Sequence, residues 1–191
     1  KTLSYTPHIR LFTWDDLPDL YDVMRRAGNP PYACAENPKE ALEADLRHPR
    51  TNPLSDVYVV EANKSILGWL RLSFELNIGR VTATIGTDPA YVEKTLWANF
   101  LDTAITRAGE AHTKLLHVPI PGTRRDFTST AEALGLKPTR VYISMEYRPA
   151  PVYLRGDYRP LPEGYRIRPM NGDEIGTLTD LQNIAFENSW G

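Results

Sequence analysis

Cysteine is nearly absent from this chain, and this scarcity excludes a disulfide-stabilised fold. Cys34 is the single cysteine among 191 residues, so no disulfide can form within the chain, which is typical of a reducing compartment. The chain also lacks a large excess of charge of either sign, because 24 acidic and 22 basic residues leave a net charge of −2. Without a basic excess to neutralise phosphates, the composition argues against nucleic acid as a partner.

Long apolar runs are missing too. No stretch approaches the ~20 apolar residues that a membrane-spanning helix needs, and the first residues do not resemble a secretion signal. These absences lead us to expect a cytoplasmic protein without a membrane partner. The apolar fraction of 41% suits one domain with a buried core, whereas 191 residues are too few for two complete domains of ~150 residues.

Capping signals and apolar spacing predict the first elements. Thr13 and Asp16 have the spacing of a capping pair, and the apolar residues after them recur at helical intervals. Asn37, Pro38 and Glu40 form a second helix-start pattern. Strand patterns cover the ranges 9–12, 57–61, 70–76 and 81–85. The last three are separated by turn residues and predict an antiparallel meander.

Helix and strand signals then alternate. Apolar residues from Val92 to Ala108 form the broadest helical stripe in the sequence. A strand is expected at 115–120, followed by a helix at 123–134 that Gly135 ends. A final alternating strand consists of Val141, Ile143, Met145 and Tyr147. The order predicts an α/β fold class, with a mixed sheet of six to seven strands flanked by about four helices.

The composition changes after residue 150. Residues 151–164 are rich in proline and glycine, which is typical of a linker. A strand signal at 165–168, the capping pair Asn171 and Glu174 and an apolar helical stripe then repeat the opening of the chain. We therefore expect one domain at 1–150, a linker at 151–164, and the first strand and helix of a second, truncated domain at 165–191.

Several short strings agree with one family. The string ALGL at 133–136 ends a helix and precedes a strand that closes with ISMEY at 143–147. Residues 85–88 lead through Pro89 into the long helix, and IRP at 167–169 opens the second segment. In this order the strings resemble the GNAT N-acetyltransferase family, once over 8–148 and partly over 165–191. The doubled arrangement is similar to that of mycothiol synthase and other two-domain members.

This resemblance implies a GNAT-like acyl-CoA N-acyltransferase fold with acetyl-CoA as co-substrate. Family members hold the coenzyme with backbone amides at the end of a splayed strand and at the start of the next helix. On this chain the cofactor-binding residues implied are Ile85, Gly86 and Thr87, together with Arg124. The amine attacks the thioester directly, and backbone N–H groups at the strand end stabilise the oxyanion.

The coenzyme loop departs from the family pattern. Its positions are here Val92, Thr95 and Trp97, and none of them is glycine. Glu93 adds a negative charge where phosphates approach. The Trp97 side chain either forces the backbone away from the ligand or turns into the core.

A second helix departs from the family as well. The tyrosine that protonates the departing thiolate is replaced by Ala131, the usual asparagine by Arg124, and a small residue by Phe127. We therefore expect weak or absent acetyl-CoA binding in residues 1–150. This copy is expected to be non-catalytic, and its catalytic residues stay unassigned.

Other reactive residues carry weaker signals. His112 and His117 lie five apart across a helix–strand junction, a spacing that predicts no metal site. Cys34 has no histidine at a recognisable offset, which argues against a nucleophile. Glu61 and Glu75 lie on meander strands, where a general base often lies in the family, but a polar sheet face is the favoured interpretation.

Two further groups have alternative interpretations. Arg124 and Arg125 at a helix start could bind a coenzyme phosphate, but a solvated pair partly matched by Asp126 is favoured. The tryptophans are expected in the core rather than in a cofactor site; they are Trp14, Trp69 and Trp97.

Three functions remain open on this basis. The first is an acetyl-CoA-dependent N-acetyltransferase acting on a small primary amine, with activity in a second GNAT domain of the parent protein. The second is a structural or docking module that binds no coenzyme. The third is a solute-binding domain that binds some other anion, and this hypothesis rests only on Arg124 and Arg125. The stripe at 175–186 needs an apolar surface, so this segment either docks on the first domain, docks on a neighbouring chain as in a homodimer, or is unfolded. Docking is favoured, because residues 165–168 can add as a strand to an exposed sheet edge.

Overall fold

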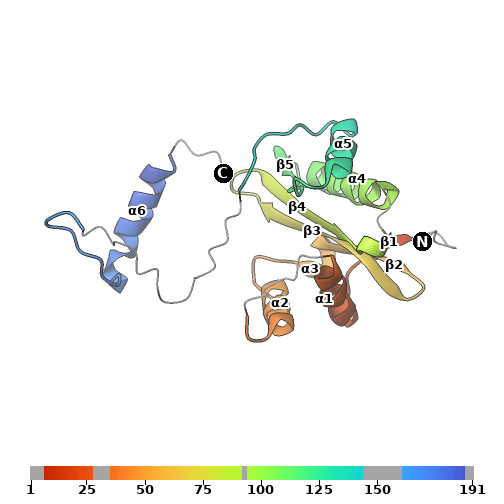
Figure 1. Cartoon of the computed structure of the whole chain (residues 1–191), viewed down its shortest axis with the longest axis horizontal. Helices are drawn as coiled ribbons and strands as arrows, with labels where there is room; N and C mark the ends of the chain where they lie inside the picture. Colours follow the sequence, from red (N-terminus) through yellow and green to blue (C-terminus); the bar gives the residue numbers. More distant parts are fainter. Residues whose placement is uncertain (1–6, 28–34, 92–93, 144–160, 188–191) are drawn as a thin grey trace, which may run out of the picture. The chain divides into compact units, whose positions relative to one another are not determined.

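The computed structural model describes residues 7–27, 35–91, 94–143 and 161–187. The chain forms two compact units, residues 1–140 and 141–191 (Figure 1). The domain boundary predicted at residue 150 lies within the range 144–160, outside the described residues.

Unit 1 is built on one five-stranded sheet whose spatial order follows the sequence. Its strands are β1 (His8–Leu11), β2 (Val57–Ala62), β3 (Ser65–Glu75), β4 (Arg80–Thr87) and β5 (Leu115–His117). The first four run antiparallel to their neighbours, and β5 runs parallel to β4. The predicted α/β class and the antiparallel meander are confirmed.

Helices cover both faces of this sheet (Figure 1). Unit 1 contains η1 (Trp14–Asp16), α1 (Leu17–Arg26), α2 (Pro38–Leu46), α3 (Pro53–Asp56), η2 (Pro89–Tyr91), α4 (Lys94–Glu110) and α5 (Arg125–Ala133). One core cluster joins Leu20, Leu42 and Trp69 beneath α1 and α2. A second joins Leu70 and Phe100 beneath α4, so the sheet is buried on both sides.

The helix starts follow from local hydrogen bonds. The Asp16 carboxylate accepts the backbone N–H of Thr13 at 2.7 Å and its hydroxyl at 3.0 Å. The Asn37 side chain accepts the N–H of Glu40 at 3.4 Å. Each bond satisfies a polar group at the chain's turn into a helix. Both predicted capping patterns are confirmed.

The apolar stripe predicted for the long helix lies on α4. Its buried residues are Leu96, Trp97, Phe100, Leu101, Ala104 and Ala108. Val92 and Glu93 lie outside the described residues. The stripe meets β4 on one side and α5 on the other, so α4 contributes to two clusters at once.

Some elements are shorter than predicted. β5 ends at His117 instead of residue 120, and α5 runs from Arg125 to Ala133 within the expected 123–134. Gly135 ends it with φ +90°, a conformation that glycine adopts at low cost.

The strand predicted through Val141 is not formed over residues 141–143, whose side chains are exposed; Met145 and Tyr147 lie outside the described residues. The described residues therefore form five strands, where the pattern predicted six to seven. A strand needs a hydrogen-bonded neighbour, and alternation of side chains does not supply one.

Unit 2 contains η4 (Gly172–Glu174) and α6 (Ile175–Ala185). The capping pair Asn171 and Glu174 is confirmed, because the Glu174 carboxylate accepts the Asn171 N–H at 2.8 Å. The strand predicted at 165–168 is not formed, because no described strand of unit 2 pairs with it. No helix among the described residues combines the length and the apolar character needed to cross a membrane.

Candidate functional site

β4 and β5 separate where the resemblance places the coenzyme. They pair over three positions, from Arg80 with Leu115 to Thr82 with His117. β4 continues to Thr87, still paired with β3. Within the described part of the chain, its residues from Ala83 onward therefore have no strand on their outer edge. The predicted Ile85, Gly86 and Thr87 lie together in this separated end.

Two aromatic rings occupy the region beside the separated strand end. Trp97 on α4 is 1% exposed and Phe127 on α5 is 5% exposed. Their rings stack with centroids 4.7 Å apart and planes at 13°. The cluster that they form takes in Ile85 of β4 and Val118 and Ile120 beyond β5. This apolar cluster thus joins the two diverging segments, and Trp97 has turned into the core, one of the two outcomes expected for it.

Arg124 closes the outer side of the stack. Its guanidinium carbon lies 3.5 Å from the Phe127 ring centroid; because Trp97 stacks against one face of that ring, the cation sits on the other. The guanidinium also donates to the Asp126 carboxylate at 2.9 and 3.1 Å. The same contact lowers the pKa of Asp126. Arg124 is therefore engaged within its own helix start.

Another ring covers the opposite face of β4. A Cβ added to Gly86 would lie 2.0 Å from Cη2 of Trp69, whose side chain is buried. A Cβ added to Gly68, the partner of Thr87 on β3, would lie 2.8 Å from the Gly86 carbonyl oxygen and 3.2 Å from Phe100. Glycine at both positions therefore lets aromatic rings close on the strand end from either face.

The turn that leaves β4 is fixed by an ion pair whose carboxylate is buried and whose arginine side chain is 44% exposed. Asp88 is 6% exposed and accepts the Arg26 Nε–H at 2.7 Å and the Ala90 N–H at 2.9 Å. Its own N–H donates to the Leu67 carbonyl at 2.8 Å. The neighbouring Thr87 hydroxyl is buried and has no hydrogen-bond partner within the described ranges. The Arg26–Asp88 pair escaped the sequence analysis, because 62 residues separate its members.

The two carboxylates considered as general bases are held by arginines. Glu61 accepts the Arg10 Nε–H at 2.8 Å. Glu75 accepts the Arg80 Nε–H at 2.6 Å, and this contact lowers the Glu75 pKa. A carboxylate kept ionised by a cation accepts a proton poorly near neutral pH. The polar-face interpretation of both residues agrees with these contacts.

The histidines do not form a metal site in the described residues. No group of three or more His, Cys, Asp or Glu side chains there could hold a metal ion. His112 is exposed and has a positive φ of 52°. The pKa of His117 is lowered by burial and, to a lesser extent, by Arg80. Cys34 lies outside the described residues.

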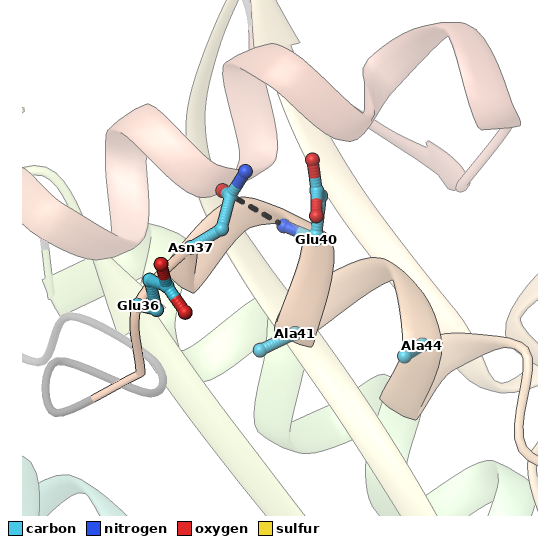
Figure 2. A pocket seen from close by; sticks show the side chains of 5 residues that line it. All are labelled: Glu36, Asn37, Glu40, Ala41 and Ala44. Carbon is cyan, nitrogen blue, oxygen red and sulfur yellow. Dashed lines mark hydrogen bonds between the residues drawn. The ribbon is translucent and has the colours of Figure 1, made fainter.

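A hollow lies on α2, away from the predicted site residues in sequence (Figure 2). It is lined by Glu36, Asn37, Glu40, Ala41 and Ala44. Asn37 already caps the helix through the Glu40 N–H, and Ala41 and Ala44 add no polar side chain to the lining. None of the residues implied for coenzyme binding lines it.

Comparison with known proteins supports the fold. No family model and no curated protein matches the chain. Among solved structures, a transcriptional regulator from Bacillus halodurans C-125 is 19% identical, with a TM-score of 0.59, covering 74% of this chain and 100% of that one.

Several of the similar structures are named as N-acetyltransferases, and two of them show the extent of the match. The ribosomal-protein-S18-alanine N-acetyltransferase from Escherichia coli is 19% identical over 68% of this chain and 77% of that one, with a TM-score of 0.52. The PaiA N-acetyltransferase from Thermoplasma acidophilum, in complex with coenzyme A, is 16% identical over 70% and 91%, with a TM-score of 0.51. This chain therefore has the mixed α/β fold of the GNAT N-acetyltransferases.

Proposed function

We propose that the chain is part of an acetyl-CoA-dependent N-acetyltransferase for a small primary amine, in which unit 1 is a non-catalytic copy of the fold. The observation that carries this proposal is the aromatic packing of Trp69, Trp97 and Phe127 around the end of β4. The solved structures that share the fold support acetyl transfer as the wider activity, since several are named as N-acetyltransferases.

Unit 1 does not fit acetyl-CoA at this position. A pantetheine chain beside β4 would have to displace the Trp97–Phe127 stack from its cluster. Removing a buried Phe or Trp side chain typically costs ~3–5 kcal/mol. Because each 1.4 kcal/mol is a factor of ten in affinity, displacement of one ring weakens binding by roughly 10²–10³-fold. We therefore derive no reaction step in unit 1.

The carboxylates weighed as bases for the amine are engaged by arginines as well. An alkyl ammonium must lose a proton before it attacks a thioester, and a carboxylate or histidine with a pKa near the working pH does this best. Glu61 and Glu75 are each bound to an arginine, and Asp88 is bound to Arg26. Together with the aromatic packing around the end of β4, these contacts favour a non-catalytic role for unit 1.

Catalysis is assigned to a second domain that begins near residue 165. The repeat of the capping pattern at Asn171 and Glu174 supports this assignment. The alternative is a protein in which both copies are structural and bind no coenzyme. Under both hypotheses, the packing around β4 makes unit 1 a structural copy. The two hypotheses differ only in whether the second domain is catalytic.

Thermal melting of the full 191-residue chain tests the claim about unit 1. Acetyl-CoA at 100 times its Kd would add ~2.7 kcal/mol of stability, which raises the Tm of a chain of this size by roughly 5–10 °C. We expect a shift of less than about 2 °C at 0.1 mM acetyl-CoA, because a low-micromolar Kd weakened 10²-fold or more is ~0.1 mM or weaker.

Pyrophosphate at the same concentration is the matched control. A rise with pyrophosphate alone would favour the anion-binding hypothesis for Arg124 and Arg125. A full shift with acetyl-CoA alone would restore unit 1 as a coenzyme site.

A further inference from the structure

Two segments of the chain share one pattern of hydrogen bonds. In the first, the Arg10 guanidinium donates to both carboxylate oxygens of Asp16 at 2.7 Å and to the Leu11 carbonyl at 3.1 Å. The Asp16 carboxylate also accepts the Thr13 N–H. A 3-10 turn and a helix follow directly, so this clamp fixes the angle at which α1 leaves β1.

The second segment repeats the clamp 158 residues later. Arg168 donates to both carboxylate oxygens of Glu174 and, at 3.0 Å, to the Pro169 carbonyl. The Glu174 carboxylate accepts the Asn171 N–H, and a 3-10 turn leads into α6. Arginine, capping residue and carboxylate keep the spacing i, i+3, i+6 in both copies, so the repeat has a defined register.

This register pairs the apolar faces of the two helices. Leu17, Leu20 and Val23 of α1 correspond to Ile175, Leu178 and Leu181 of α6. The α1 side chains are 7%, 0% and 0% exposed, against 58%, 41% and 61% for those of α6. The same stripe is therefore core in unit 1 and open in unit 2.

Unit 1 shows what covers such a stripe. The residues clustered with α1 on the sheet are Val57 and Val59 of β2 and Ile66 and Trp69 of β3, each 3% exposed or less. β-branched and aromatic side chains on neighbouring strands form a pleated apolar surface of this kind.

We propose that the face Ile175, Leu178 and Leu181 docks onto the β-sheet of a second α/β unit built like unit 1, in the register by which α1 docks onto β2 and β3. This inference rests on the part of the proposed function that places a second domain after residue 165. It does not depend on whether unit 1 binds coenzyme.

The register also predicts where the second interface differs. Arg26, which pairs with Asp88 in unit 1, corresponds to Ile184, and Met24 corresponds to Gln182. Ile184 is 71% exposed. The second sheet is therefore expected to meet this position with an apolar residue, and not with the carboxylate that follows β4 in unit 1.

A helix graft within the full chain tests the register. Residues 17–27 are replaced by 175–185, with Tyr21, Met24 and Arg26 retained, so the changes within the cluster are Leu17→Ile and Val23→Leu. Two control grafts use 174–184 and 176–186 with the same residues retained. Each control shifts the stripe by one residue, which rotates it by ~100° about the helix axis. The first of them introduces Leu17→Glu and Val23→Asp at buried positions.

We expect a cooperative melt for the in-register graft, with a Tm within about 10 °C of the parent, and slow hydrogen exchange in β2 and β3. Both shifted grafts should lose the cooperative melt. An in-register graft that melts no better than the shifted ones would overturn the proposal.

Photo-crosslinking from position 178 in the ungrafted chain tests the competing occupant. We expect sedimentation of a monomer and no crosslink between copies. A stable dimer with crosslinks from position 178 to a second copy's unit 1 would reassign the face to a homodimer contact. Because neither measurement involves acetyl-CoA, a thermal shift with the coenzyme would refute the proposed role of unit 1 and leave this inference standing.

Discussion

Phe127→Ala is the most informative perturbation of the candidate site. The Phe127 ring is 5% exposed and lies between the Trp97 ring and the Arg124 guanidinium. Burial of the side chain alone is worth ~3–5 kcal/mol in comparable truncations. The aromatic stack adds ~0.5–1.5 kcal/mol, and the part-exposed cation contact adds ~0.5–1 kcal/mol.

The expected loss of unfolding free energy is therefore ~3–5 kcal/mol, since partial collapse of the cavity offsets part of the sum. This corresponds to a fall in Tm of roughly 6–20 °C for a chain of this length. Urea unfolding followed by tryptophan fluorescence measures the free energy and reports on the surroundings of Trp97 in the same experiment. Ser129→Ala on the exposed side of α5 is the control, with an expected change within about 0.5 kcal/mol.

A loss below about 1 kcal/mol for Phe127→Ala would refute the reasoning. It would mean that α5 does not hold the stack against β4, and the separated strand end would then be open to a ligand.

Two further predictions concern neighbouring elements. Gly86→Ala should destabilise the chain by more than about 2 kcal/mol and red-shift tryptophan fluorescence, because the new Cβ meets the Trp69 ring; a neutral effect in urea unfolding would show that the ring does not lie there. Asp16 has a pKa held below its ordinary value of 3.8, mainly by the Arg10 guanidinium, so its stabilising contribution is present above that value and disappears as the pH falls through the lower folded-state pKa. Asp16→Asn should therefore flatten the acid limb of the stability–pH curve, and an unchanged acid limb would contradict the role given to Arg10.

Local signals predicted the helix starts because their causes are local. The capping bonds of Asp16, Asn37 and Glu174 join residues three apart, so the sequence itself contains both partners. The meander was predictable for the same reason, since Asn63 and Lys64 form a short turn with positive φ at both residues.

The long-range contacts that define the candidate site could not be predicted from the sequence. Trp97 and Phe127 were recognised as departures from the family, yet their stacking joins residues thirty apart on two helices. Trp69 over Gly86 and Arg26 with Asp88 are also long-range contacts. Their partners follow from the arrangement of the sheet, which no short pattern encodes.

Strand predictions failed where a neighbour was needed. Residues 141–143 and 165–168 alternate like strands, but neither range pairs with a described strand. Hydrogen bonding to a neighbouring strand, and not side-chain alternation, completes a strand. The predictions at 57–61 and 81–85 succeeded because β3 lies between the two and pairs with both.

The claim that aromatic packing excludes the coenzyme from unit 1 is tested most directly by calorimetric titration of the full chain with acetyl-CoA. The account predicts no saturation of the heat up to about 0.1 mM ligand, since displacing one buried ring weakens binding by roughly 10²–10³-fold. A saturable isotherm with a Kd in the low micromolar range would contradict it and make Ile85, Gly86 and Thr87 a working coenzyme site.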